Sequence, residues 1–107
     1  MRPTATQLIL LQTDLGLLHP TDAQIIQLSH FLSMAATAIE RAGIQLSVDV
    51  PADDMLLAMY AAWLYRKRIQ GPDGSGMPMM LRAELNDRKI AAAGGDGGDL
   101  RQAADRM

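Results

Sequence analysis

The feature of the sequence that most restricts its fold is an uninterrupted run of apolar residues from Met55 to Tyr65. Pro51 precedes the run and Gly71 follows it, which predicts a helix from about Pro51 to Ile69, because proline favours the first helical turn and glycine marks helix ends. A helix that is apolar nearly all round is either central in its fold or covered on a second side by another chain. The run is shorter than the roughly 20 residues that span a bilayer, so we expect no membrane partner.

Proline and glycine positions delimit three further helices. The clearest begins at Thr21 or Asp22 and ends at Gly43, and its apolar residues recur three and four positions apart, from Ile25 through Ala42. A shorter helix is expected from about Thr4 to Leu15, with Thr4 or Thr6 as its cap. A fourth begins at Pro78 and continues to the glycines at 94–98. Its expected apolar side consists of Met80, Leu81, Leu85 and Ile90, and Glu84 and Arg88 form an i,i+4 pair.

These patterns predict an all-α fold: a small four-helix bundle with a short extended connector and a flexible C-terminal tail. The connector is 44–50, which alternates apolar and polar residues but would be a lone, unpaired strand. Residues 1–93 are expected to form the helical domain, and 94–107 a tail hinged at its glycines. The helices at 21–43 and 51–69 are expected to form the core pair. The residues predicted to be mostly buried are Leu28, Phe31, Leu32, Ala35, Ile39, Leu56, Met59, Tyr60, Trp63, Leu64, Leu81 and Leu85.

The composition excludes several kinds of chemistry. The chain has no cysteine, so disulfides and thiolate metal sites are impossible, and its two histidines have no partner pattern. The net charge of −2 argues against a dedicated binder of phosphate backbones, which is usually strongly basic. We therefore expect no enzyme, no metal and no cofactor.

Three polar features have a structural explanation that is simpler than a catalytic one. Asp53 and Asp54 are adjacent, so they diverge by about 100° on a helix and are better suited to its positive N-terminus. His30 lies beside an apolar stripe and is expected at the boundary of the core. The loop at 71–76 is rich in glycine but lacks the lysine and hydroxyl of a phosphate-binding loop.

Three other features have two open interpretations each. The basic run 66–68 either complements the negative end of its helix or contacts phosphates. Met77, Met79 and Met80 either fill the core or form an adaptable binding surface. The tail after Gly98 either docks on a neighbour as a short amphipathic helix or has no role.

Two segments carry a resemblance to a known family. Residues 59–68, MYAAWLYRKR, and 77–88, MPMMLRAELNDR, resemble the C-terminal half of small tailed-phage head–tail connector proteins, also called adaptor or head-completion proteins. The segments LQTDLG at 11–16 and ERAGI at 40–44 are also similar to that family, and the resemblance covers about 8–90. Met79 stands where the family pattern has arginine.

The resemblance implies a structural virion protein without a cofactor. Such proteins assemble as a ring, expected to be a dodecamer, beneath the portal protein in the virion neck, after synthesis in the bacterial cytoplasm. The ring extends the channel through which double-stranded DNA passes without sequence specificity, and it meets a head-closure (stopper) or tail-completion protein. The residues expected at the portal or subunit interface are Arg66, Arg68, Met77, Met79, Arg82, Leu100, Arg101, Arg106 and Met107.

The alternative is a small helical DNA-binding regulator. In that case the third or fourth helix would enter a groove of the duplex, with DNA contacts from Arg66, Lys67, Arg68, Arg82 and Arg88. The acidic balance of the chain argues against this function. A steep dependence of duplex binding on salt would support it.

Overall fold

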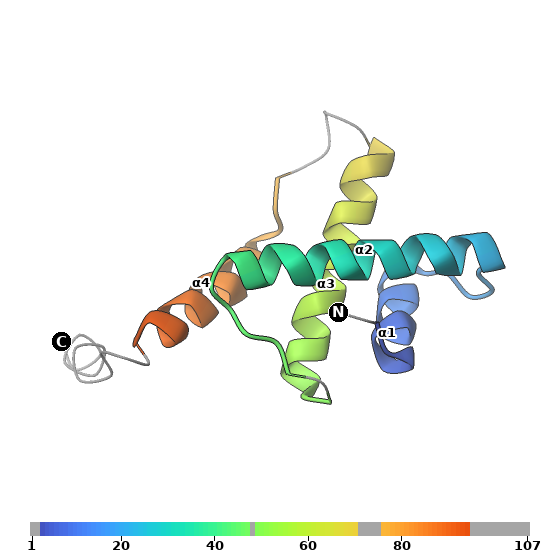
Figure 1. Ribbon diagram of the computed structural model, residues 1–107. Coiled ribbons are helices and arrows are strands. Elements are labelled where there is room, and N and C mark those ends of the chain that lie inside the picture. The colour runs from blue at the N-terminus through green and yellow to red at the C-terminus, as the bar shows by residue number, and fades with distance from the viewer. Residues whose placement is uncertain (1–2, 48, 71–75, 95–107) are drawn as a thin grey trace.

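The computed structural model describes residues 3–47, 49–70 and 76–94, which form four helices and no strand. The helices are α1 (Ala5–Leu15), α2 (Asp22–Arg41), α3 (Pro51–Gln70) and α4 (Met79–Gly94). The all-α prediction is therefore confirmed, and the predicted helix ends are correct to within about two residues. Helix α3 contacts each of the other three. Figure 1 shows α2 lying across α3, with α1 and α4 on opposite sides of α3.

Local hydrogen bonds define both ends of α1 and the start of α2. Thr4 Oγ1 accepts from the Gln7 amide at 3.2 Å, and the Gln7 side chain accepts from the Thr4 amide at 2.9 Å. Thr21 and Gln24 repeat this reciprocal capping box at α2. Helix α1 ends at Gly16, whose φ of 74° is in the left-handed region that glycine adopts most readily. Of the two predicted caps, Thr4 and Thr6, the structure uses Thr4, and the predicted end at Gly16 is confirmed.

The core lies around the first half of α3. Eight of the twelve residues predicted to be buried are buried, and Leu28, Leu32 and Leu56 have no exposed surface. The other four are partly buried and pack against the edge of this core: Met59, Tyr60, Trp63 and Leu64. Burial falls along α3 because its C-terminal part extends beyond α2 (Figure 1). Helices α2 and α3 do pack together, as predicted, but α1 contacts α3 as extensively as α2 does.

Several predictions of which side a residue faces were wrong. Met80 and Ile90 were placed on the apolar side of the fourth helix, yet they are 78% and 57% exposed. Leu81 and Leu85 face the core, and Met80 lies about 100° around the helix from Leu81. Ala42, expected on the buried face of α2, is exposed at its C-cap, and His30 is exposed rather than at the core boundary.

The segment between α2 and α3 is an extended connector, as predicted. No residue of 44–47 or 49–50 belongs to a strand, and residue 48 lies outside the described ranges. Ile44 is buried in the core, and the Ser47 amide donates to Asp53 Oδ2 at 2.8 Å. These two contacts hold the connector against the start of α3.

Candidate functional site

The basic run at the end of α3 is partly engaged within the chain. Arg66 Nη2 donates to the carbonyl oxygen of Asp14 at 2.8 Å and lies 3.5 Å from its carboxylate, which ties α3 to the end of α1. Lys67 Nζ lies 5.1 Å from the centre of the Trp63 ring, within cation–π range. Arg68 is exposed. Arg66 and Arg68 were both predicted at an interface, and both are exposed. Arg66 in addition makes a contact within the chain, to Asp14.

The methionines before and at the start of α4 divide between the two predicted roles. Met77 is partly buried, packs against the core and lines a cavity of about 140 Å³ between α2, α3 and α4. Arg82 is exposed and lies at the same cavity. Met79 is 84% exposed and Met80 is 78% exposed. Met77 therefore packs at the edge of the core, whereas Met79 and Met80 are surface residues.

Helix α4 has apolar residues on two opposite sides. Leu81 and Leu85 face the core, whereas Met79, Ala83 and Ile90 are exposed. At about 100° per residue, these three lie on the side of the helix opposite the two leucines, and the exposed Asn86 and Asp87 lie on that side with them. We call Met79, Ala83 and Ile90 the outer stripe of α4.

An ion pair joins α4 to the start of α3. Arg88 donates through Nη1 to Asp53, whose side chain is 9% exposed, and through Nε to Glu84 at 2.9 Å. These hydrogen bonds, first the one to Asp53 and then the one to Glu84, raise the pKa of Arg88 above its ordinary value. The predicted Glu84–Arg88 pair is confirmed. Arg88 also pairs with Asp53 of α3, and this second contact joins the two helices.

The adjacent carboxylates of α3 diverge, as predicted, but both are buried. Asp53 pairs with Arg88 of α4. Asp54 instead faces α1, where its Oδ1 accepts a hydrogen bond from the side chain of the buried Gln7 at 3.1 Å. Sequence reasoning assigned both carboxylates to the helix N-terminus and missed these partners. The sequence did contain a signal for these partners. Both aspartates lie in the first turn of a helix that other elements must cover, and a buried carboxylate needs hydrogen-bond donors from those elements.

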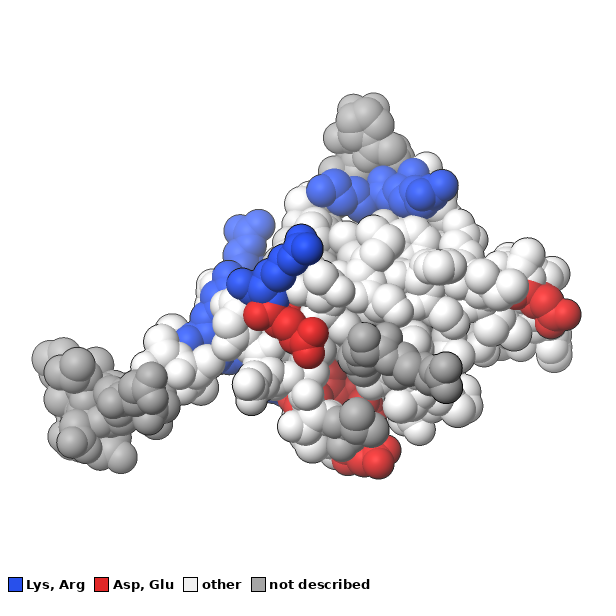
Figure 2. All heavy atoms as spheres, viewed as in Figure 1, with Lys and Arg blue, Asp and Glu red and all other residues white. Residues whose placement is uncertain are grey.

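Charge is unevenly distributed over the described residues. Residues 3–47 and 49–54 hold six acidic side chains and one basic one. Residues 55–70 and 76–94 hold six basic side chains and two acidic ones. Figure 2 shows Lys and Arg gathered at the end of α3 and on α4. The net charge of −2 conceals this separation, which counting the two halves of the sequence separately would have revealed.

A mainly apolar groove lies between α1 and α3. Its volume is about 300 Å³, and Met55 at its edge is 48% exposed. Its lining residues belong to α1 and α3, and α1 lies on the side of α3 away from α4 (Figure 1). We call it the α1–α3 groove, and its lining residues are Leu10, Thr13, Asp14, Met55, Ala58 and Met59.

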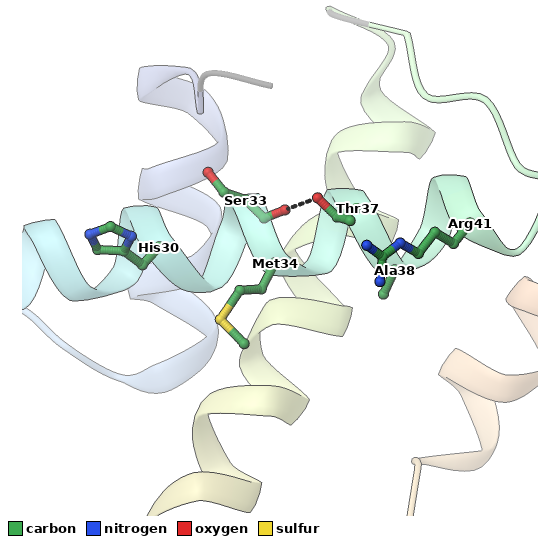
Figure 3. Close-up of a pocket in the computed structure, with 6 residues that line it drawn as sticks. All are labelled: His30, Ser33, Met34, Thr37, Ala38 and Arg41. Carbon is green, nitrogen blue, oxygen red and sulfur yellow. Dashed lines mark hydrogen bonds between the residues drawn. The ribbon is translucent and has the colours of Figure 1, made fainter.

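A second hollow, of about 380 Å³, runs along the surface of α2. Figure 3 shows its lining residues, His30, Ser33, Met34, Thr37, Ala38 and Arg41. The Thr37 hydroxyl donates to the Ser33 carbonyl oxygen at 3.0 Å, and this bond lies within one helix. The lining includes no carboxylate to act with His30 as an acid–base pair.

Neither a metal cluster nor a membrane span is evident in the described part of the chain. No three of its histidine, aspartate and glutamate side chains are placed to hold a metal ion. None of the helices described has both the length and the apolar character needed to cross a bilayer. Leu100, Arg101, Arg106 and Met107, the predicted interface residues of the tail, lie outside the described residues.

Comparisons with protein-family models, with curated proteins and with solved structures gave no match to this chain.

Proposed function

We propose that this protein is a head–tail connector subunit of a tailed phage, which forms a ring on the portal protein and joins it to a head-closure or tail component. The observation that carries the proposal is the outer stripe of α4. Residues 77–88 are one of the two segments that carry the resemblance to connector proteins, and within them Met79, which departs from the family pattern, and Ala83 are exposed. Several exposed apolar residues grouped on one side of a helix, unlike a single exposed residue, are typical of surfaces that bind other proteins.

The attachment of α4 supports a binding role for that helix. The Asp53–Arg88 pair fixes α4 against α3, so the outer stripe is held in one orientation on the surface. A surface that is ordered before binding loses less conformational entropy when a partner arrives. The exposed cations Arg68 and Arg82 lie in the same half of the chain and supply polar contacts for the edge of an interface.

The proposal is tested with the portal protein encoded in the same genome. The isolated chain is expected to be a monomer or a small oligomer, and to assemble into a ring on the portal, because a template with repeated sites adds avidity to weak contacts. Mass measurement of the chain, the portal and their mixture gives the stoichiometry. Absence of any complex with the portal would contradict the proposal.

A genetic test addresses the role in the virion. Deleting the gene from its phage is expected to leave DNA-filled heads that do not accept tails, and a plasmid copy should restore infectious particles. Normal tailed particles without the protein would overturn the proposal.

The DNA-binding regulator is the second candidate, and the grouping of basic residues on α3 and α4 favours it. Three of those cations already have partners within the chain: Arg66 with Asp14, Lys67 with Trp63, and Arg88 with Asp53. Phosphate contacts give duplex affinity that falls steeply with salt. Tight duplex binding with a steep salt slope, together with no portal complex, would favour the regulator. Weak binding at physiological salt would favour the connector.

A further inference from the structure

We propose that the cavity of about 140 Å³ between α2, α3 and α4 binds a small ligand that carries a carboxylate on a short apolar group. Figure 1 shows the C-terminal end of α2 beside α4, where this cavity lies. The apolar group occupies the cavity, and Arg82, Asn86 and Lys89 of α4 hold the carboxylate at its solvent side. We call the cavity the α2–α4 pocket. The proposal does not depend on the connector function.

The inner wall of the α2–α4 pocket is apolar. Ile39 and Leu85 are buried, and the partly buried Tyr60 packs against the same core. Helix α2 contributes two alanines, Ala38 and Ala42, and their small side chains leave room beside α4. An apolar cavity of about 150 Å³ is large enough to hold a benzene molecule, so this one suits a group of about five carbon atoms.

The solvent side of the pocket is basic. Arg82, Asn86 and Lys89 all line the pocket and are exposed. At about 100° per residue they lie within about 60° of one another around α4. Arg82 and Lys89 are two turns apart, about 10 Å along the helix, a distance that two long side chains can close around one small anion. The amide of Asn86 lies between them and offers a further donor.

The two cations have no acidic partner of their own in the part of the chain that the structure describes. The ion pairs formed there by lysine and arginine involve only Arg66 and Arg88. No residue that lines the α2–α4 pocket is acidic. Arg82 and Lys89 are therefore available to an anion from outside the chain.

The combination of the two walls selects the class of ligand. An arginine guanidinium matches the two oxygens of a carboxylate, and a lysine adds a compact positive charge. The apolar wall behind them gains from burying a hydrocarbon group, which an inorganic anion lacks. An organic acid with a short chain satisfies both walls, whereas an alcohol, an amine or inorganic phosphate satisfies one of them at most.

A set of matched small molecules tests the two parts of the site. Pentanoate, 1-pentanol and pentylamine share a five-carbon chain and differ in charge, and acetate keeps the carboxylate but lacks the chain. In titrations followed by the amide signals of the full chain in NMR spectra, pentanoate should shift signals at the end of α2 and along α4. Its affinity should exceed that of pentylamine at least about tenfold, because the cations attract one and repel the other. Equal affinities for pentanoate and pentylamine, or for pentanoate and acetate, would overturn the proposal.

Two substitutions locate the binding. Arg82→Gln should lower the affinity for pentanoate about tenfold, because a charged hydrogen-bond donor to the carboxylate is lost. The control is Arg68→Gln, which makes the same charge change at an exposed position on α3 outside the pocket and should leave the affinity unchanged. Equal effects of the two variants would contradict a site at Arg82. Ala42→Leu should fill the cavity and remove pentanoate binding, and unchanged binding in this variant would also overturn the proposal.

A free carboxylic acid and the C-terminal residue of a peptide both offer this chemistry. Pentanoate represents the first source, and N-acetylvaline represents the second. Tighter binding of pentanoate supports the site and identifies a free acid as its ligand, whereas the reverse order supports the site and identifies a peptide end. Failure of both to bind at millimolar concentration would overturn the proposal.

Discussion

Helices α1 to α3 and helix α4 are held in the structure by different means. In the first region, buried leucines and alanines such as Leu32, Ala35 and Leu56 pack without exposed surface. In the second, two buried leucines, Leu81 and Leu85, are supplemented by the Arg88 ion pair. The first three helices therefore form the stable body of the protein, and α4 is a smaller element attached to it.

This difference separates stability from orientation. Apolar burial contributes free energy roughly in proportion to area but has little directionality. A hydrogen-bonded ion pair contributes less net free energy because both charges lose water, yet it needs a defined geometry. In this protein the ion pair with a buried carboxylate joins α4, the helix that carries the outer stripe, to α3. Helix α1 also makes directional contacts with α3, through Gln7–Asp54 and Arg66–Asp14.

The largest effect is expected from a cavity in the body of the protein. Leu56→Ala should lower the free energy of unfolding by about 2–5 kcal/mol, because Leu56 has no exposed surface and its neighbours cannot fill the space. Urea denaturation followed by circular dichroism measures the change. The control is Met79→Ala, whose effect should stay within about 0.5 kcal/mol. Similar costs for the two variants would contradict the distinction between core and stripe.

An effect in the lower part of that range is expected at the edge of the core. Trp63→Ala should cost about 3 kcal/mol, because the indole packs edge-on against Tyr60 with ring centres 5.5 Å apart and lies beneath Lys67. Trp63→Phe should cost less than about 1 kcal/mol. Phenylalanine keeps an aromatic ring at this position, and it removes a buried N–H group whose lack of a hydrogen bond destabilises the native protein. That donor, Nε1, has no acceptor among the described residues. Equal costs in urea denaturation for the two variants would contradict this account of Trp63.

The attachment of α4 is tested at Arg88. Arg88→Ala should cost about 1–3 kcal/mol, since it leaves the carboxylate of Asp53 without its main charged partner. Amide hydrogen exchange should show α4 losing protection while α3 keeps it. Because pairing raises the pKa of Arg88, its contribution is fully present below its ordinary pKa and declines only as the pH rises through the raised value. The cost should thus be constant from neutral to moderately alkaline pH, and a decline within that range would contradict this origin.

The smallest effect is expected at the other partner of Arg88. Glu84 is 39% exposed and lies one turn from Arg88 on the same helix, so Glu84→Ala should cost no more than about 0.5 kcal/mol. Thermal unfolding of the single and double variants with Arg88→Ala gives the coupling. A Glu84→Ala cost as large as that of Arg88→Ala would mean that the pair within α4, and not the link to α3, holds the helix.

Local features of the sequence predicted the helices well because local interactions determine helix ends. Thr4 and Gln7 lie three residues apart, and the capping role of Thr4 is visible without a tertiary structure. The side of α4 that faces the core was not predictable in the same way. Met80, Leu81, Leu85 and Ile90 surround most of that helix, so only the position of α3 determines which of them are buried.

The candidate interaction surfaces were predicted only in part. The Met79 and Arg82 surface was anticipated from its sequence, but the sequence left core and surface roles for the methionines equally open. The Asp53–Arg88 pair joins residues 35 positions apart, and no periodicity relates two residues at that separation. The α1–α3 groove also depends on the packing of two helices and has no signal in either one.

The reciprocal capping boxes at Thr4 and Thr21 have a consequence for the order of folding. Each specifies the start of a helix through residues three positions apart, before any distant contact exists. All but two residues of the buried apolar cluster precede Trp63 in the chain, and the two exceptions are Leu81 and Leu85. During synthesis from the N-terminus, the material for most of the core is therefore available before α4 emerges. The exposed stripe of α4 is then added to a body that has already begun to fold, which shortens the time that this apolar surface spends beside an unfolded chain.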